Sequence, residues 1–284
     1  MAWVLKKSRF IALLSLTILT IIVWLSVWQI QPKNHVRVSF LDVGQGDAIL
    51  LTASNGNQIL IDGGRDKRVL SKLSREMPFF DRSIDVVIAT HPDADHIGGL
   101  PKVLVRYNTG VFLESGAQSD STTDSELKRI IGRTKKELLQ ARGGMVVSMG
   151  DGSYLQILFP DRDVSGLDTN DASIVAKYVF GDTCFLLTGD SPIKIEDYLV
   201  SLYGESLSCD VLKVGHHGSN TSTGEKFLNA VSPQMAIISA GKDNSYGHPH
   251  AEVVERLRQK DVEILNTAET GTIRIKANTE RLER

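Results

Sequence analysis

The sequence predicts an α/β protein with mixed β-sheets, preceded by a single long apolar helix. From residue 36 onward, short apolar runs alternate with polar, helix-prone segments, and glycine-rich turns separate several of them, which is typical of one α/β domain. Residues 10–30 carry no charge and stand apart from this pattern. Three of the apolar runs end in histidine or aspartate, and ligand sites of α/β domains lie at strand ends. We therefore expect one domain over residues 34–284 behind an N-terminal segment of residues 1–33.

The apolar stretch from Phe10 to Ile30 is long enough to cross a bilayer as one helix. Trp24 and Trp28 lie toward its far end, where an aromatic belt would meet the membrane interface. A cleaved signal peptide is the alternative, but such a peptide has a shorter apolar region and small residues at its cleavage site. Residues 27–32 contain no small-x-small pattern, so we expect an uncleaved membrane anchor.

Three basic residues precede the apolar stretch, at Lys6, Lys7 and Arg9. A positively charged flank usually stays in the cytoplasm. The segment is therefore expected to cross the cell membrane once, with everything after Pro32 on the outer side.

Charge and cysteine content narrow the class of protein. The formal net charge is −2, so the protein has no overall positive charge that would attract nucleic acid. A local groove lined by basic residues is still an alternative. Two cysteines are too few for a disulfide framework. Cys184 and Cys209 lie in apolar, strand-like runs, where we expect buried free thiols. A disulfide between them is the alternative if the domain lies outside the cytoplasm.

The expected secondary structure follows from apolar periodicity and turn residues. Pro192 lies just inside the start of one helix, where proline is favoured. Helices are expected over residues 125–141, 192–203 and 251–259. Strands are expected over residues 36–41, 48–52, 58–61, 84–89, 146–148, 154–159, 173–180, 183–188, 210–214, 235–239 and 272–275.

The strongest chemical signal is the run His91-Pro92-Asp93-Ala94-Asp95-His96, which follows the apolar strand at 84–89 after Thr90 alone. Four groups able to bind a divalent cation fall within this run, and only a turn lets such close neighbours converge. Imidazole together with carboxylate suits Zn²⁺ or Mn²⁺. The alternative is an aspartate-rich turn that caps the next helix, but a cap needs one aspartate and no histidine. We therefore interpret His91, Asp93, Asp95 and His96 as candidate metal ligands.

Two further apolar runs end in candidate ligands. Asp190 follows the run 185–188 and could bridge two metals, or it could cap the helix that begins near Pro192. His216 and His217 follow the run 211–214 and are flanked by glycines. Because adjacent side chains point in different directions, we expect one histidine to be a ligand and the other either to face the substrate or to support the ligands from behind.

The remaining polar clusters carry weaker signals. His248 and His250 follow the strand at 235–239. Either could contact a phosphate or donate a proton, and an exposed turn at a helix start is the alternative. Two glycine-rich turns contain Asp47 and Asp62. Neither turn matches a P-loop or a dinucleotide-binding fingerprint.

Taken together, these runs resemble the metallo-β-lactamase family, whose signature is HxHxDH, over nearly all of residues 36–275. The resemblance implies a four-layer αββα sandwich with a site for two divalent metal ions, zinc or manganese. It implies a bridging carboxylate at Asp190 and a structural aspartate at Asp62. It also implies metal ligands at His91, Asp95, His96, and His216 or His217.

The sequence departs from this family at two positions. Asp93 stands where the family usually has histidine, and the family's middle histidine has no counterpart. The approximate place of that histidine is taken by the run 170–173. We interpret Asn170 and Ser173 in this run, together with Asp47, as supporting residues behind the ligands. With fewer imidazoles, the first metal position is expected to bind more weakly or to select zinc less strongly.

A narrower resemblance rests on the runs LDVGQGDA, HPDADH, NxxS, LTGD, KVGHHGS and YGHPH. Their combination is similar to the C-terminal hydrolase domain of ComEC-type DNA-uptake proteins. Those proteins also carry a membrane channel of many spans, whereas this sequence shows one apolar span. We therefore expect a stand-alone relative, to which a role in DNA uptake does not simply transfer.

The resemblance implies hydrolysis of a phosphodiester by a metal-activated water. Nucleic acid such as DNA is the first candidate substrate, and a cell-envelope phosphodiester such as a phosphocholine ester is the second. Asp95 and His248 are the candidate catalytic residues, and His248 would steady charge or protonate the leaving oxygen. A lactonase, thioesterase or β-lactamase is an alternative, because fold does not determine function. A binding protein that keeps the motifs without turnover is another.

Overall fold

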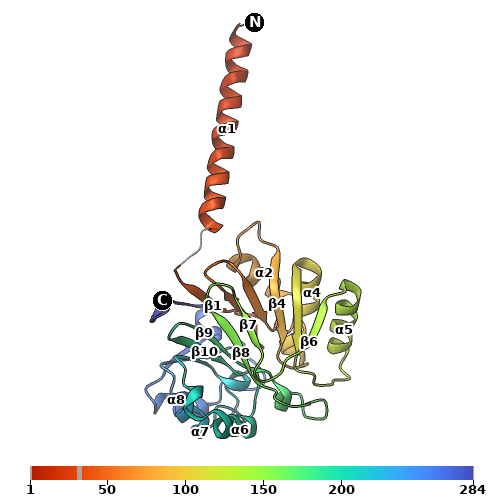
Figure 1. Cartoon of the computed structure of the whole chain (residues 1–284), viewed down its shortest axis with the longest axis vertical. Coiled ribbons are helices and arrows are strands. Elements are labelled where there is room, and N and C mark those ends of the chain that lie inside the picture. The colour runs from red at the N-terminus through yellow and green to blue at the C-terminus, as the bar shows by residue number, and fades with distance from the viewer. Residues whose placement is uncertain (1, 31–33, 284) are drawn as a thin grey trace. The chain divides into compact units, whose positions relative to one another are not determined.

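The computed structural model describes residues 2–30 and 34–283. Backbone contacts divide the chain into two compact units, Met1–Lys33 and Asn34–Arg284 (Figure 1). The first unit contains helix α1 (Ala2–Ile30). Pro32 and the side chain of Trp28, on which the topology and aromatic-belt predictions partly depend, lie outside the residues and side chains that the structure describes.

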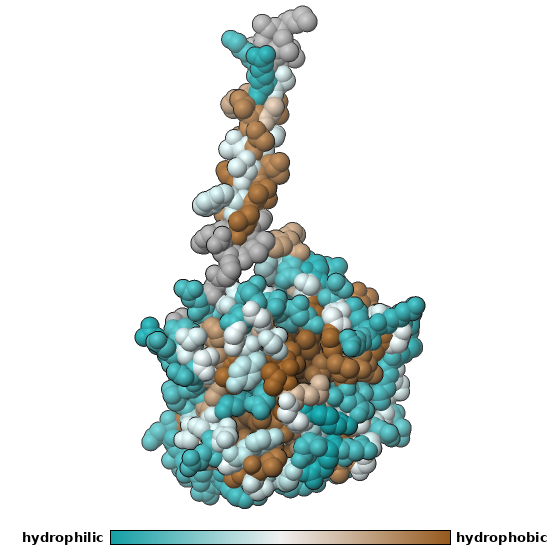
Figure 2. Space-filling view, viewed as in Figure 1, coloured by the Kyte–Doolittle hydropathy of each residue, from teal (hydrophilic) through white to brown (hydrophobic). Residues whose placement is uncertain are grey.

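Helix α1 has the length and composition of a membrane span. Its stretch Lys6–Leu25 covers 20 residues with a mean hydropathy of 2.1. Apolar side chains dominate the described surface of this helix after its basic N-terminal part (Figure 2). The helix is therefore a candidate single span, as the uncharged stretch predicts.

The second unit contains two mixed sheets packed face to face, with helices on both outer faces (Figure 1). This arrangement confirms the predicted four-layer αββα sandwich. The first sheet, in the order β15-β14-β1-β2-β3-β4-β5-β6, comprises β1 (Val36–Phe40), β2 (Ile49–Thr52), β3 (Gln58–Ile61), β4 (Ser83–Ala89), β5 (Asn108–Glu114), β6 (Glu137–Gln140), β14 (Ile273–Ala277) and β15 (Leu282–Glu283). The second sheet, in the order β13-β12-β11-β10-β9-β8-β7, comprises β7 (Val146–Ser148), β8 (Tyr154–Phe159), β9 (Val175–Phe180), β10 (Thr183–Leu187), β11 (Val211–Lys213), β12 (Met235–Ile238) and β13 (Glu263–Asn266).

Helices complete the outer layers. Those packed on the first sheet are α2 (Arg68–Glu76), α4 (Leu100–Arg106) and α5 (Thr122–Thr134). Those packed on the second sheet are α6 (Ile193–Tyr203), α7 (Glu225–Val231) and α8 (Ala251–Arg258). Shorter helical turns are α3 (Ala94–Ile97), α9 (Thr267–Thr270) and the 3₁₀ turns Asn170–Ala172, Gly204–Leu207 and Gly215–Gly218.

Strands buried on both faces explain why the sequence reads as continuous apolar runs. In β2, Ile49 and Leu51 pack between the sheets, whereas Leu50 packs against the helices of the first sheet. Successive strand residues point to opposite faces, so an apolar residue is needed at each position when both faces are covered. The apolar runs therefore predicted most strands to within one or two residues at each end.

The region after α5 differs from the prediction. A helix was expected over residues 125–141, but α5 ends at Thr134, and Lys135 adopts a left-handed backbone with φ of 51° as its C-terminal cap. Residues Glu137–Gln140 then add to β5 as the parallel edge strand β6. All four residues of β6 are exposed. Its sequence, Glu-Leu-Leu-Gln, neither alternates nor forms a continuous apolar run, so it lacks the pattern by which a strand is recognised.

The prediction of free thiols is wrong. Cys184 and Cys209 are buried, as expected, but they form a disulfide, with their Cα atoms 5.1 Å apart. Cys184 lies in β10, and Cys209 lies just ahead of the parallel neighbour β11. The pairing of these two strands brings the cysteines together, and strand order is not visible in the apolar runs themselves.

Candidate metal centre

The candidate metal centre lies where strands of the two facing sheets end. The loop after β4 carries the run 91–96, whose second half begins helix α3. The loop after β10 carries Asp190, and the loop after its parallel neighbour β11 carries His216 and His217. Residues that are distant in the sequence therefore converge at one edge of the sandwich, where α/β domains place their sites.

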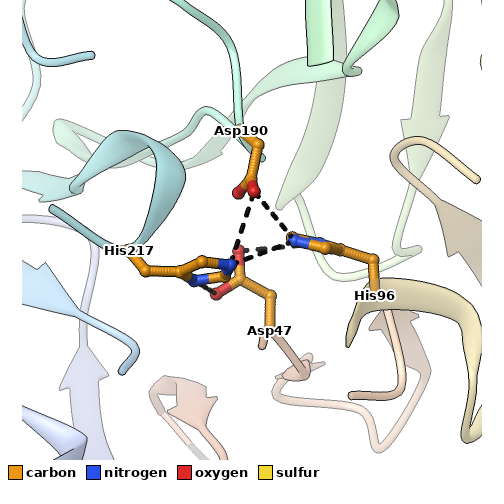
Figure 3. A group of neighbouring side chains, drawn as sticks. All are labelled: Asp47, His96, Asp190 and His217. Atoms are coloured by element: carbon orange, nitrogen blue, oxygen red, sulfur yellow. Dashed lines mark hydrogen bonds and ion pairs between the residues drawn. The ribbon is translucent and has the colours of Figure 1, made fainter. Parts of the chain in front are cut away.

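Four side chains form what we call the inner cluster: Asp95, His96, Asp190 and His217. His96 Nε2 lies 3.3 Å from His217 Nε2 and 3.2 Å from Asp190 Oδ2. His217 Nε2 lies 3.4 Å from Asp190 Oδ2 and 3.5 Å from Asp95 Oδ2. Figure 3 shows the two imidazoles converging on the carboxylate of Asp190.

The spacing of the inner cluster fits one divalent cation. Zinc binds nitrogen and oxygen ligands tetrahedrally at about 2.0–2.2 Å, which places neighbouring ligand atoms about 3.4 Å apart. The separations among the ligand atoms of His96, Asp190 and His217, and between those of His217 and Asp95, are 3.2–3.5 Å. Asp190 Oδ1 is also buried without a hydrogen-bond partner among the described residues, and such atoms need an explanation. Two imidazoles and two carboxylates suit zinc or manganese.

A second group, called the outer cluster, consists of His91, Asp93, His216 and the shared Asp190. His216 Nε2 lies 3.6 Å and His91 Nε2 4.0 Å from Asp190 Oδ2. Asp93 Oδ2 lies 3.7 Å from His91 Nε2. Within the described part of the chain, the buried His91 Nε2 has no hydrogen-bond partner. These residues fit a second, wider cation position that shares Asp190 with the first.

His216 and His217 both face Asp190, which differs from the expectation that their side chains diverge. Both residues adopt a left-handed backbone, with φ of 48° and 57°, a conformation uncommon outside glycine. The turn brings both Nε2 atoms within 3.6 Å of Asp190 Oδ2. The side chain of His216 is 27% exposed, whereas that of His217 is buried. His216 therefore lies nearer to solvent and incoming substrate.

Hydrogen bonds behind the inner cluster orient its imidazoles. Asp62 Oδ2 lies 2.8 Å from His96 Nδ1 and accepts a hydrogen bond from Thr90 Oγ1 at 2.7 Å. His217 Nδ1 lies 2.9 Å from the carbonyl oxygen of Ser239. An oxygen held at Nδ1 directs the opposite nitrogen toward a metal. Asp62 thus lies where the predicted supporting aspartate should lie.

Ser173 links the outer cluster to Asp190. His91 Nδ1 lies 3.0 Å from Thr90 Oγ1 and 3.3 Å from Ser173 Oγ. Ser173 Oγ also accepts a hydrogen bond from the Asp190 amide at 3.3 Å. Asn170 Oδ1 is buried and has no hydrogen-bond partner in the described ranges, and its supporting role stays a prediction.

Asp47 lies behind the inner cluster. One potential ligand atom from each of Asp47, His96, Asp190 and His217 lies within 4.8 Å of the others, as Figure 3 shows. Asp47, however, faces the Nδ1 atoms, at 3.5 Å from His217 and 4.0 Å from His96. Its Oδ2 is already paired with Lys213 Nζ at 2.5 Å. Since the Nε2 atoms face Asp190, we assign Asp47 to support and not to direct ligation.

The glycine-rich turn ahead of β2 packs against the ligand loop. The Asp47 amide donates a hydrogen bond to the Asp95 carbonyl oxygen at 3.2 Å. Gly46 has φ of 117°, and a Cβ there would lie 1.9 Å from that same oxygen. Only glycine permits this close approach, so the turn serves to place Asp47 and Asp95.

The carboxylates around the inner cluster stabilise positive charge at its centre. Burial is the largest single effect and would lower the pKa of both His96 and His217. The carboxylate of Asp190, together with Asp62 beside His96 and Asp47 beside His217, outweighs burial and raises both pKa values well above the ordinary value. Burial would raise the pKa of Asp190, but the same two imidazoles hold it well below its usual range. A divalent cation would supply this charge in place of protons, so charge balance agrees with ligand geometry.

His248 lies beside the histidine pair. Its ring centroid is 5.5 Å from that of His216 and 6.3 Å from that of His217. Burial, followed by the neighbouring imidazoles, lowers its pKa to about 4, so the ring is neutral at neutral pH. A neutral imidazole donates an N–H hydrogen bond but is a weak proton donor. The structure therefore favours charge stabilisation over proton delivery for this residue.

Two buried charged residues near the site had no role predicted from the sequence. Lys213 is fully buried and paired with Asp47. Glu196 in α6 accepts hydrogen bonds from the amides of Thr223 at 2.7 Å and Gly224 at 2.8 Å, in the loop that follows the histidine pair. For Lys213, a lysine inside an otherwise apolar strand was the feature of the sequence that could have indicated a buried charge. Glu196 carries no comparable signal, because its helix has a polar face.

Several curated proteins are similar in sequence to this chain. It is 35% identical to Recombination protein 2 of Haemophilus influenzae over 284 residues, covering 99% of this chain and 33% of that protein. Over 85% of the chain it is 31% identical to Competence protein ComA of Neisseria gonorrhoeae and 30% identical to ComE operon protein 3 of Bacillus subtilis. The chain spans about a third of the length of these relatives. These similarities confirm the resemblance to competence proteins.

Solved structures share the fold. The metallo-β-lactamase fold protein YhfI of Bacillus subtilis superposes with a TM-score of 0.57 at 14% identity, covering 86% of this chain and all of that one. Igni18, a metallo hydrolase of Ignicoccus hospitalis, gives a TM-score of 0.54 at 15% identity, covering 84% of this chain and 98% of that one. At such low identity these likenesses show the fold alone.

The family profile covers the whole candidate centre. The profile of the Metallo-beta-lactamase superfamily matches residues 41–242, a range that contains both clusters and their supporting residues. The fold of this superfamily binds divalent metals, often two, in agreement with the two clusters that share Asp190. Because the profile matches most of its length and its fold is the four-layer sandwich, this chain belongs to the metallo-β-lactamase superfamily.

Proposed function

We propose that this protein is a metal-dependent phosphodiesterase that cleaves nucleic acid. The observation that carries the proposal is the inner cluster. The ligand atoms of His96, Asp190 and His217 are spaced for one cation, with Asp95 beside His217. The far sides of the two rings are held by Asp62 and Ser239. Superfamily membership and this cluster together support a metal-dependent hydrolase. The competence and recombination names of the relatives favour a nucleic acid substrate over a lactone or thioester.

We assign one divalent ion, zinc or manganese, to the inner cluster and a second to the outer cluster. When bound, such ions polarise phosphoryl oxygens and make a bound water more acidic. Asp190 contacts both clusters and so holds the two positions together. His248 donates its ring N–H to the developing charge on the leaving oxygen. Asp95 supplies a carboxylate ligand 3.5 Å from Nε2 of His217.

We also propose that residues 1–33 anchor the hydrolase domain, residues 34–284, to the outer side of a cell membrane. Lys6, Lys7 and Arg9 ahead of the apolar helix favour a cytoplasmic N-terminus. The disulfide between Cys184 and Cys209 supports this orientation, because disulfides persist in oxidising compartments and are rare in the cytosol.

The test uses the full chain purified in detergent. Hydrolysis of bis(p-nitrophenyl) phosphate and of labelled DNA is measured after chelation and after addition of Mn²⁺ or Zn²⁺. We expect metal-dependent turnover of both substrates, which His96→Ala abolishes and His35→Ala, an imidazole substitution outside both clusters, leaves intact. Hydrolysis of nitrocefin or a lactone without cleavage of either phosphodiester would replace the proposal with the alternative hydrolases. Metal binding without turnover on any substrate would favour a binding protein.

A further inference from the structure

An exposed aromatic ring lies beside the candidate metal centre. Tyr246, in the loop between β12 and α8, is 53% exposed. Its ring is stacked on that of His248, with centroids 5.7 Å apart and planes 22° from parallel. His248 in turn lies 6.3 Å from His217 of the inner cluster. One face of the tyrosine ring is thus covered by a residue of the site, and much of the rest is open to solvent.

The loop that presents Tyr246 is held by its own hydrogen bonds. Asn244 Oδ1 accepts hydrogen bonds from the amides of Tyr246 at 3.2 Å and His248 at 3.0 Å. Asn244 Nδ2 donates to the carbonyl oxygens of Gly241 at 2.9 Å and His248 at 2.6 Å. One asparagine therefore holds the backbone of the loop from which both rings project. A ring held in advance loses less conformational entropy when a ligand stacks on it.

A cation lies at the edge of the same ring. Arg65 Nη2 donates a hydrogen bond to the Tyr246 hydroxyl at 3.4 Å. Arg65 follows β3 of the first sheet, whereas Tyr246 follows β12 of the second. An aromatic face next to a guanidinium is the combination that binds single strands, because the base stacks on the ring and the phosphate pairs with the arginine.

We infer that Tyr246 and Arg65 form a stacking platform that selects single-stranded nucleic acid. A base that flanks the phosphodiester at the metal centre stacks on the open face of Tyr246, while Arg65 meets a backbone phosphate. The ring centroids of His217 and His248 are 6.3 Å apart, and those of His248 and Tyr246 are 5.7 Å apart. This base therefore lies within about two nucleotides of the inner cluster. Single strands are favoured because a paired base must first leave its own stack. The inference rests on the proposed phosphodiesterase function and names its substrate class.

A phosphocholine ester suits this platform less well. A tyrosine ring can bind a quaternary ammonium by a cation–π contact. Arg65, however, places a positive charge at the tyrosine hydroxyl, where it repels a choline head group and attracts a phosphate. The charge at the ring edge therefore favours nucleic acid over choline.

The experiment measures binding without turnover. Fluorescence anisotropy measures the affinity of the full chain, in detergent and EDTA, for two labelled strands of equal length. One is a single-stranded oligonucleotide, and the other carries abasic sugars. Tyr246→Ala should weaken binding of the base-containing strand roughly tenfold. It should change the affinity for the abasic strand by less than about twofold. Tyr246→Phe should bind like the wild type. Arg65→Ala should weaken binding of both strands. It should also reduce the slope of log affinity against log salt concentration by the amount expected for about one phosphate contact.

Phe79→Ala provides the matched control. Phe79 is 87% exposed and precedes β4, whereas the ligand loop follows the other end of that strand. This variant should bind both strands like the wild type, and thermal unfolding of each variant checks that it is folded. Equal weakening of both strands in Tyr246→Ala, or no weakening, would overturn the platform. So would tighter binding of glycerophosphocholine than of the oligonucleotide. Wild-type hydrolysis of bis(p-nitrophenyl) phosphate separates these failures from failure of the proposed function.

Discussion

Lys213 Nζ lies 2.5 Å from Asp47 Oδ2, and both side chains are buried between the two sheets. Lys213 ends β11 of the second sheet, and Asp47 precedes β2 of the first. Burial opposes ionisation of Asp47, but the ammonium of Lys213, together with His217 and His96, outweighs burial and lowers the pKa of Asp47 to about 2. This ion pair therefore joins the two halves of the sandwich directly behind His96 and His217.

Removing the lysine should unfold the protein more easily. Lys213→Met leaves a buried carboxylate without its partner, which typically costs about 3–5 kcal/mol. Urea unfolding followed by circular dichroism should show this loss in the free energy of unfolding. The double variant Lys213→Met with Asp47→Asn should recover part of it, because no unpaired charge remains. Additive losses in the two single variants and the double variant would show that the pair is not coupled.

Metal content should depend on the inner cluster. After reconstitution and dialysis, we expect up to two divalent ions per chain by elemental analysis. His96→Ala should lower that number, because the variant loses one imidazole from a set of ligands 3.2–3.5 Å apart. His35→Ala, which changes an imidazole ahead of β1, should keep the wild-type content. Equal metal in His96→Ala and the wild type would show that the cation lies elsewhere.

Asp93 should set the metal preference. Its side chain is 39% exposed and lies 3.7 Å from His91 Nε2, at the position where the family usually has histidine. A hard carboxylate oxygen favours Mn²⁺ relative to Zn²⁺, although intrinsic affinity still rises toward zinc. We expect faster turnover with Mn²⁺ in the wild type, a shift toward Zn²⁺ in Asp93→His, and a large loss of activity in Asp93→Ala. Rates are compared at buffered free metal, and the same Mn²⁺-to-Zn²⁺ ratio in wild type and Asp93→His would exclude Asp93 as a ligand.

Glu196 should make stability fall as pH rises. Burial outweighs the hydrogen bonds from Gly224 and Thr223 and raises the pKa of Glu196 from its ordinary value of 4.5 to about 7. Between these values the folded state keeps a proton that the unfolded state releases, so the contribution is full below about 4.5 and is lost as pH rises toward 7. The loss is about 3 kcal/mol at most.

The measurement for Glu196 is a difference between two proteins. Urea midpoints are recorded from pH 5 to pH 8 in EDTA for the wild type and Glu196→Gln, whose amide does not titrate. Other titrating groups, including the clustered histidines, cancel in this comparison. The wild type should lose stability relative to Glu196→Gln up to about pH 7 and then run parallel to it. Parallel curves throughout would place the pKa of Glu196 near its ordinary value.

The proposed orientation predicts the behaviour of fusion proteins. Alkaline phosphatase fused after residue 33 should be active, because that enzyme matures outside the cytoplasm, and a cytoplasmic reporter at the same point should be silent. The reverse pattern would overturn the orientation. Deleting residues 1–33 should yield a soluble, folded fragment, and loss of the folded circular dichroism signal would show that the segment is part of the domain.

Local patterns in the sequence were sufficient for most of the fold. Apolar runs buried on both faces predicted strands such as β3 and β8, and the polar residues that follow β4, β10 and β11 predicted where a site would lie. The exposed edge strand β6 was instead predicted as the end of a helix, because an edge strand in solvent has no apolar pattern.

The sequence by itself determined which groups the centre could use, because imidazoles and carboxylates at strand ends are visible along the chain. Only the tertiary structure decided how these groups are used. It joined Cys184 to Cys209 and Lys213 to Asp47, and it turned both His216 and His217 toward Asp190 through a left-handed backbone. The physical reason is that strand order, sheet packing and strained turns depend on contacts between residues far apart in the chain, which no local pattern encodes.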